Sequence, residues 1–590
     1  MRSRRPFFAL RTFAVLAVAL APLVLGCGDD KDKKGPEAAA PPNAAFALQG
    51  GPIGEIVPPA SVVAWGGADT VDRLAAGAQA FAQQISPLVP PVQETLNGEL
   101  RRRLALTKLE GVDWSKPARL ALFDPKGMPK AVLALVLTLS GKDQFLATLP
   151  AVKKENDEGN AITYRDDLGR TICLNFVNDT VVVTWEKKQF PTNIEFFVRL
   201  AKSTVGEGQT FNVSATNVSA LYAKEIEDMI AQAKQQVTTG AMAVSPMQGE
   251  VSSRVLTWMV STFKDLERVE VVPKLPEDGA TLAIRLHPRA GSELAKSFRS
   301  IKARPHTLLS RIPADATMFA SFSTDPDATD SLTTRFIEWA MTINFGTKVP
   351  EGYGQAMREY FQATGGEMVV AAHKPVSGDG LALTTLLSVR DEQKLRDAMR
   401  KSKLIFKDKD VVEASKKMGT TIEYKENAYK VGAVPVDVVE VKYEKGKNPL
   451  AQLGPFGEAL SELTTSHMAT SKDLSLIAYG KDGRKGVEAF LGGKVQGGLD
   501  KAAGPVRAFR MAAKEPVGIF YISPIEMAKR ASLGGKNPLA DGLKDLASTT
   551  GAALSFSATD GVLEILLDVP VEQARNLFQG VARAKALLPQ

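Results

Sequence analysis

The sequence DGATLAIRLHP at residues 278–288 is matched later in the chain by DGVLEILLDVP at residues 560–570. Both stretches open with Asp-Gly, continue as a strand and end at a proline ten residues after the aspartate. Asp-Gly favours a turn, and alternation of apolar with other residues is typical of a strand with two different faces. The two stretches therefore predict the same structural element at two places in the chain.

The elements around these stretches agree in order. In each half, a strand and an amphipathic helix precede an antiparallel meander, and a helix carrying Phe298 or Phe578 closes the half. The tetrad ITYR at residues 162–165 matches IEYK at residues 422–425. We predict an internal duplication with halves at residues 56–305 and 306–590. The predicted fold class is α+β, in which each of the two related tandem halves is a mostly antiparallel sheet partly covered by helices.

The matched elements are separated by segments of different length. Tyr424 lies 49 residues before Asp473, whereas Tyr164 lies only 15 residues before Asp179. We interpret the extra residues as loops, where specialised function usually lies.

The N-terminus predicts an export signal. It opens with four arginines, Arg2, Arg4, Arg5 and Arg11. An apolar run follows at residues 12–25, which is shorter than the ~20 residues of a bilayer-spanning helix. Residues 1–26 are therefore predicted to be a signal peptide.

The tetrad Val24-Leu25-Gly26-Cys27 resembles the lipobox of bacterial lipoproteins, although Leu25 stands where a smaller residue is usual. The resemblance implies cleavage before Cys27, acylation of Cys27, and attachment to a bacterial membrane through its acyl chains. Residues 27–55 are then the lipidated cysteine and a disordered tether, since they are rich in Asp and Lys and then in Ala, Pro and Gly. We expect a cell-envelope protein that faces the periplasm or the outside. The Pro-Ala-Asp-Ala sequence at Pro313 and the duplication also resemble large uncharacterised exported bacterial proteins, and this resemblance implies no activity.

The formal charge of +7 includes the four arginines before Cys27, so the mature chain would carry +3. That charge is small for its length and gives no support for nucleic-acid binding. Lipidation of Cys27 would leave Cys173 as the only thiol, so no intrachain disulfide could form. We interpret Cys173 as a half-buried structural residue of a strand.

No motif predicts catalysis, a cofactor or a metal. The tetrad Ser261-Thr262-Phe263-Lys264 has the S-x-x-K spacing of penicillin-binding proteins and β-lactamases. However, Leu256, Met259, Phe263 and Leu266 form the apolar stripe of a predicted helix, which places Ser261 on the opposite, solvent-facing side. The predicted sites therefore contain no catalytic, cofactor-binding or metal residue, and only lipidation at Cys27.

Possible metal ligands are isolated or poorly spaced. The four histidines, His287, His306, His373 and His467, form no pair at metal-binding spacing. The acidic segment at residues 325–330 lacks the glycine and the final glutamate of a calcium loop, and helix capping explains it. Basic clusters at residues 101–103 and 394–417 could contact anionic headgroups or could be ordinary solvated surface.

Three functions remain open. The first is a non-catalytic binding or scaffold lipoprotein whose envelope partner docks on the variable loops or between the halves. The alternative is a lipid or apolar-ligand binding or transfer protein, and the third, less favoured, is a hydrolase with an unrecognised site. The sequence leaves open the ligand, the oligomeric state and the choice between inner and outer membrane.

Overall fold

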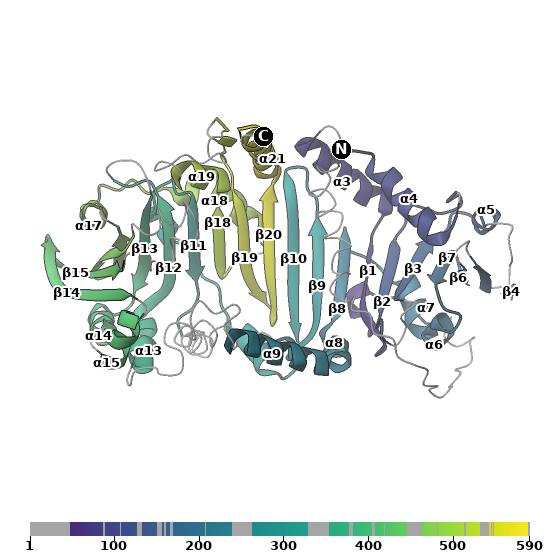
Figure 1. Cartoon of the computed structure of the whole chain (residues 1–590), viewed down its shortest axis with the longest axis horizontal. Helices are drawn as coiled ribbons and strands as arrows, with labels where there is room; N and C mark the ends of the chain where they lie inside the picture. Colours follow the sequence, from purple (N-terminus) through teal and green to yellow (C-terminus); the bar gives the residue numbers. More distant parts are fainter. Residues whose placement is uncertain are drawn as a thin grey trace. The chain divides into compact units, whose positions relative to one another are not determined.

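The computed structural model describes residues 48–86, 89–106, 108–126, 132–149, 156–157, 161–165, 169–206, 208–238, 262–327, 353–376, 381–403, 408–417, 419–444, 463–480, 482–512, 515–531, 542–543, 545–546 and 548–587. It mixes helices with strands, and the strands form a large antiparallel sheet (Figure 1). The chain forms two compact units. The predicted boundary between residues 305 and 306 lies within unit 2.

Unit 1 combines the described residues up to 65 with Arg103–Asp113 and Ala118–Thr204. Its elements are η2 (Ile53–Glu55), the first part of β1 (Val62–Ala68), β2 (Ala118–Phe123), β3 (Leu133–Thr138), α5 (Lys142–Ala147), β4 (Asn156–Asp157), β5 (Ala161–Arg165), β6 (Thr171–Val177), β7 (Thr180–Thr184), α6 (Gln189–Thr192) and α7 (Ile194–Lys202). The strands are hydrogen-bonded in the order β4-β5-β6-β7-β3-β2-β1. The predicted meander of β5, β6 and β7 is confirmed.

Unit 1 has an aromatic core. The ring of Phe197 on α7 lies 5.8 Å from that of Phe123 and 5.5 Å from that of Phe190. Trp65 is also buried, and its indole Nε1 donates to the carbonyl of Ile53 at 2.8 Å. Because Ile53 is buried as well, the last residues of the predicted tether pack into the fold, and the tether would have to end before them.

Unit 2 comprises Gly66–Arg102, Trp114–Pro117 and Val205–Gln590. Its strands after β1 are β8 (Gln209–Ser214), β9 (Leu266–Lys274), β10 (Gly279–Pro288), β11 (Met318–Ser323), β12 (Thr364–His373), β13 (Ala382–Val389), β14 (Thr420–Val431), β15 (Val434–Tyr443), β16 (Thr465–Thr470), β17 (Leu474–Tyr479), β18 (Gly518–Ile522), β19 (Ala552–Thr559) and β20 (Val562–Pro570). From β1 they are hydrogen-bonded in the order β8-β9-β10-β20-β19-β18-β11-β12-β13-β17-β16-β15-β14, and every pair from β8–β9 onward is antiparallel. The last strand of the first half, β10, thus pairs with the last strand of the second, β20.

In unit 2, α21 lies at one end of the strands and α8 and α9 lie at the other (Figure 1), whereas α17 contacts β16 and β17 and α18 contacts β18 and β19. The helices are α3 (Val71–Ile85), α4 (Val92–Leu104, whose last two residues belong to unit 1), α8 (Ala215–Leu221), α9 (Ala223–Thr238), α11 (Glu293–Ser300), η3 (Leu308–Arg311), α13 (Tyr353–Ala363), α14 (Glu392–Lys403), α15 (Lys409–Lys417), α17 (Gly483–Leu491), η6 (Leu499–Lys501), α18 (Ala503–Met511), α19 (Pro524–Ala531) and α21 (Val571–Leu587). The Thr70 hydroxyl caps α3 by accepting from the Arg73 amide, and Ser214, not Asn217, caps α8. Each cap satisfies a backbone donor that a helix end leaves without a partner.

Two predicted assignments are wrong. Leu266 begins β9, so the helix predicted to include it ends earlier. The segment between Tyr424 and Asp473 is not one long loop, because it contains β15 and β16. Residues 162–165 lie on β5, which pairs with both β4 and β6, whereas residues 422–425 lie on β14, which pairs with β15 at the end of the strand order.

The Asp-Gly pairs at residues 278–279 and 560–561, which were matched in the sequence, occupy their turns one residue out of register. The β19–β20 turn is Asp560-Gly561, and both residues have positive φ angles. The β9–β10 turn is Glu277-Asp278, because Lys274 lies opposite Thr281 and the Gly279 amide donates to the carbonyl of Pro276. Asp278 and Gly561 are thus the second residues of their respective turns. A one-residue shift matters because it moves every side chain to the opposite face of the sheet.

Candidate functional site: an exposed apolar sheet face

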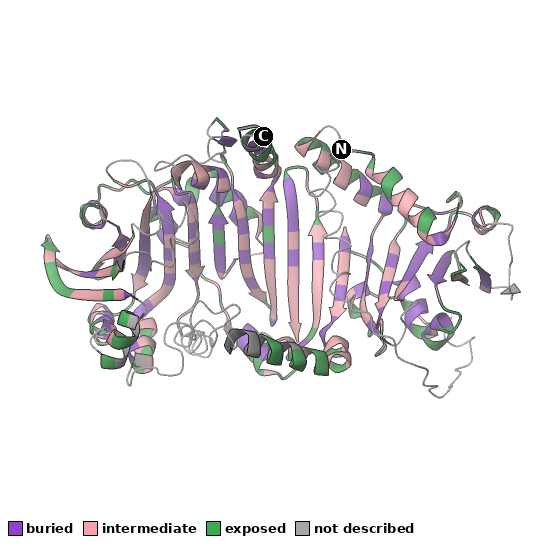
Figure 2. Cartoon of the chain, in the orientation of Figure 1, coloured by how far each residue is buried: buried purple, intermediate pink, exposed green. Residues whose placement is uncertain are grey.

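One face of the sheet in unit 2 carries apolar side chains that are only partly covered. Residues directly opposite one another on antiparallel strands point to the same face, so the strand registers define this face. We call it the central apolar face. It consists of Phe211 and Val213 on β8, Val269 and Val271 on β9, Leu282, Ile284 and Leu286 on β10, Leu563, Ile565 and Leu567 on β20, Leu554, Phe556 and Ala558 on β19, Phe520 and Ile522 on β18, and Met318, Ala320 and Phe322 on β11. All of these residues are intermediate or exposed (Figure 2).

The opposite face of the same strands is mostly buried although it carries many polar groups. Asp568 on β20 is 2% exposed and Ser555 on β19 is 3% exposed, whereas Phe520 is 41% exposed and Leu567 is 38% exposed. A sheet with one solvated face normally turns its polar side chains to water. In these strands, by contrast, the polar side chains are mostly buried and the apolar side chains are partly exposed, which makes this face the candidate site.

The buried charge on the opposite face is compensated. The guanidinium of Arg507 on α18 donates to both carboxylate oxygens of Asp568, at 3.0 and 2.9 Å, and it also binds Asp278. Burial raises the pKa of Asp568, and the hydrogen bonds from Arg507 oppose that shift. Nearby, a hydrogen bond to His287 lowers the pKa of Glu270. The contacts of Arg507 attach α18 to the buried face of the sheet.

Aromatic rings form a row across the apolar face. The Phe520 ring lies edge-on to the rings of Phe322 and Phe556, with centroids 5.2 and 5.8 Å apart. Gly518 stands opposite both Phe322 and Phe556 in the register, and a Cβ atom at Gly518 would lie 2.8 Å from the Phe322 ring. The absence of a side chain at Gly518 therefore makes room for the rings.

Helices border the face at the ends of the strands. At one end, Leu294 and Phe298 of α11 pack against Leu286 and Leu563. At the other end, α21 contacts β10 and β20. The middle of the face lies between these helices, where Phe520 and Leu567 are exposed.

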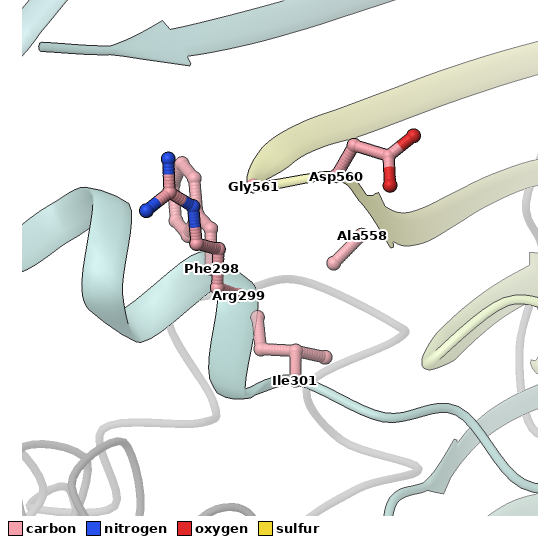
Figure 3. A pocket seen from close by; sticks show the side chains of 6 residues that line it. All are labelled: Phe298, Arg299, Ile301, Ala558, Asp560 and Gly561. Atoms are coloured by element: carbon pink, nitrogen blue, oxygen red, sulfur yellow. The ribbon is translucent and has the colours of Figure 1, made fainter. Parts of the chain in front are cut away.

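A pocket of about 400 Å³ opens beside α11, where the apolar face ends. It is lined by Phe298, Arg299 and Ile301 from the helix end and by Ala558, Asp560 and Gly561 from the β19–β20 turn. The Arg299 guanidinium stands on one side of the turn, and the Asp560 carboxylate points away on the other (Figure 3). The pocket thus combines apolar walls with one exposed cation and one exposed anion.

The residues considered from the sequence do not form a chemical site. Cys27 and Ser261 lie outside the described residues. Cys173 is 4% exposed, so it is more deeply buried than predicted, and it accepts from the Thr163 hydroxyl at 3.8 Å. This environment fits the structural role expected for Cys173.

The four histidines are placed apart and have separate partners. Nε2 of His306 donates to the Pro516 carbonyl at 2.8 Å, so Nδ1 accepts from Ser321, whose side chain is fully buried. His373 is bound in the same way, since Nδ1 donates to the Lys374 carbonyl and Nε2 accepts from Thr384. His467 contacts the Tyr429 hydroxyl, and His287 contacts the Glu270 carboxylate. Burial lowers the pKa of both His306 and His373, which favours the neutral form of each ring.

Charged side chains of the predicted basic and acidic clusters form ion pairs with other residues of the chain. In the basic segment that forms α14 and α15, Arg400 pairs with Glu426 and Lys401 with Glu359. Lys403 is buried, and it pairs with Asp437 at 2.7 Å beside the Tyr424 hydroxyl. The adjoining cavity is only about 50 Å³, which has room for little more than water. Two acids of the 325–330 segment also pair with arginines, Asp325 with Arg304 and Asp327 with Arg390.

Across the described ranges, no group of three or more His, Cys, Asp or Glu side chains is arranged to hold a metal ion. In the same part of the chain, no helix is long and apolar enough to cross a bilayer. No protein-family model, curated protein or solved structure matches this chain. The fold and the site define its class: an α+β protein with a large antiparallel sheet and an exposed apolar face.

Proposed function

We propose that this protein is a non-catalytic, lipid-anchored protein of the bacterial envelope that binds acyl chains on its central apolar face. This is the lipid-binding alternative among the functions considered from the sequence. The observation that carries it is the exposure of Phe520, Ile522 and Leu567 on strands whose other face is buried. Burying a fully exposed side chain of this kind contributes roughly 1.5–3 kcal/mol, so covering the remaining exposed part of Phe520, which is 41% exposed, contributes about 1 kcal/mol. Coverage of several such side chains by an apolar ligand would therefore be favourable.

The dimensions of the face suit an acyl chain. Ala320, Phe520, Leu554, Leu567 and Leu282 stand opposite one another in a single row across five strands. At about 4.8 Å between strands, this row is about 19 Å long. An acyl chain in one leaflet spans about half of the ~30 Å hydrocarbon core of a bilayer. One chain therefore fits along the row.

The chemistry of the face also favours an acyl chain over a peptide. Each strand in the row pairs with a neighbour on both sides, so its backbone donors and acceptors are satisfied within the sheet. A peptide that added a strand would need a free sheet edge. A partner on this face can gain mainly apolar contact, which a hydrocarbon chain supplies without polar groups to desolvate.

The proposed lipid anchor would place the apolar face near a source of lipid. Acylation at Cys27 would hold the folded part close to a membrane, and residues 28–47 would link the anchor to the first described residue. Lipid would then be available at high local concentration. Replacing Cys27 with Ser should abolish covalent labelling of the protein with fatty acid in growing cells, whereas continued covalent labelling of the variant would contradict the anchor.

We also propose that the two halves arose by duplication. Read from its outermost strand, the first half has the strand order β4-β5-β6-β7-β3-β2-β1-β8-β9-β10. Read in the same way, the second half has the order β14-β15-β16-β17-β13-β12-β11-β18-β19-β20. The two orders agree strand for strand, and β10 pairs with β20. With the corrected register, Ala283 corresponds to Leu566, and these two residues lie directly opposite each other. Strands β8–β10 and β18–β20 are then related by a two-fold rotation about this pair. The centre of the apolar face lies beside this axis.

The direct test is native mass spectrometry of residues 27–590 carrying Cys27→Ser, produced in bacteria and purified under mild conditions without detergent. Bound lipid at about one per chain supports the proposal. The double variant F520S/L567S should lose that lipid, while V506S, which changes a valine on α18 that is 47% exposed, should keep it. Absence of lipid together with a retained protein partner would favour the scaffold function.

A further inference from the structure

We propose that α21 docks the protein on the surface of an anionic lipid bilayer. The first observation is an exposed apolar strip on this helix. Phe578 is 47% exposed, Val581 is 44% exposed and Ala582 is exposed beside them. At about 100° per residue, the three side chains fall within an arc of about 100°. They form one continuous strip along the helix.

A basic strip lies next to the apolar one. Arg575 and Arg583 are both exposed, and helical geometry places Arg575 about 60° and Arg583 about 140° from Phe578, both in the direction of Ala582. The acidic residue of the first turn, Glu572, accepts hydrogen bonds from Thr549 and Thr550. The outer surface of α21 therefore combines positive charge with apolar side chains.

The inner side of α21 is fixed to the fold. Gln573, Asn576 and Gly580 are buried, and Leu577 packs in a cluster with Ile525 and Leu543. The helix also contacts α3, α19 and β20. Because this side of α21 packs against the fold, the apolar strip on its opposite side points outward.

A helix that follows a strand of this sheet can bury its apolar side chains. Helix α11, which follows β10 as α21 follows β20, also carries a phenylalanine, but Phe298 is only 6% exposed because it packs against the sheet. A helix with an apolar strip and flanking arginines is the arrangement that lies in a bilayer interface, where the apolar residues insert and the cations meet anionic headgroups. Charge complementarity therefore selects an anionic bilayer as the partner.

Docking through α21 would bring a bilayer to one end of the central apolar face, because α21 contacts both β10 and β20. The proposal does not depend on acyl-chain binding. A protein that docks on vesicles but binds no acyl chain would keep this inference and overturn the proposed function.

The experiment is vesicle flotation with residues 27–590 carrying Cys27→Ser, so that no acyl anchor contributes. The vesicles contain either 30% phosphatidylglycerol in phosphatidylcholine or phosphatidylcholine alone. We expect binding to the anionic vesicles that weakens with added salt, since screening reduces the attraction of headgroups for arginines. The variant F578S/V581S should bind at least about tenfold more weakly, because it removes most of the inserted apolar area.

Two further variants make the test decisive. R575E/R583E should abolish the preference for anionic vesicles, whereas V506S, a matched exposed valine on α18, should bind as the parent does. Circular dichroism checks that each variant is folded. Absence of vesicle binding, equal binding by F578S/V581S, or a Phe578-dependent dimer in solution would each overturn the proposal.

Discussion

At the scale of single residues, Gly518 is the position on which the aromatic row depends. Its missing side chain leaves space for Phe322, and a Cβ atom would come within 2.8 Å of that ring. We expect Gly518→Val to displace the ring from its contact with Phe520 and to lower the free energy of unfolding by about 1–3 kcal/mol. Urea denaturation measures the change.

Gly98 is the matched control for this substitution. It lies in the interior of α4, and a Cβ atom there would meet nothing within 4 Å. Gly98→Ala should therefore raise the free energy of unfolding by about 0.5–1 kcal/mol, because alanine loses less conformational entropy in a helix. A loss of stability from Gly98→Ala, or none from Gly518→Val, would contradict this description of the two sites.

The buried His373 makes stability depend on pH. Burial lowers its pKa in the folded state below the ordinary value of 6.5. As the pH falls below 6.5, the unfolded chain therefore takes up the proton first, and the folded state becomes relatively less stable. We expect the free energy of unfolding to drop between pH 7 and pH 5, and the drop to be smaller in His373→Gln. An equal or larger drop in the variant would show that this ring is not the titrating group.

At the scale of elements, Arg507 joins α18 to β20. It is 8% exposed and binds Asp568, which is 2% exposed. Arg507→Ala should cost about 3–5 kcal/mol of stability, because it leaves a buried carboxylate without its cation. The double variant R507L/D568L should recover most of that loss, since it removes both charges.

Arg510 provides the comparison on the same helix. It also contacts Asp278, but its side chain is 65% exposed. Arg510→Ala should therefore change stability by less than about 1 kcal/mol, as is usual for an exposed ion pair. Similar losses from R507A and R510A would show that burial does not control the strength of the Arg507 contact.

At the scale of the whole molecule, local sequence patterns predicted many elements well. The strands at Gly279–Pro288 and Val562–Pro570 lie where the two stretches that open with Asp-Gly predicted them, because alternation and turn residues define them locally. The strand beginning at Leu266 was missed, since the apolar spacing of the preceding residues suggested a helix that continued through it. The strands β15 and β16 were missed because a comparison by length treated their segment as a loop.

The candidate site could not be predicted from the sequence. Alternation shows that a strand has two different faces, but coverage of either face depends on helices that are distant in the chain. Phe520 and Tyr521 are adjacent aromatic residues, yet Phe520 is 41% exposed and Tyr521 is 4% exposed. The polar partners of the covered face, such as Arg507 and Asp568, are 61 residues apart. Which face of the sheet is buried therefore depends on tertiary packing and not on the local sequence of each strand.

The central claim is that acyl chains lie on the central apolar face, and photo-crosslinking tests it most directly. A fatty acid with a diazirine on its chain would be bound to the mature Cys27→Ser protein, irradiated and mapped by peptide mass spectrometry. We expect adducts on β18 and β20, at Phe520, Ile522 and Leu567, that excess unlabelled fatty acid suppresses. Saturable labelling confined to other parts of the chain, or no saturable labelling, would contradict the claim.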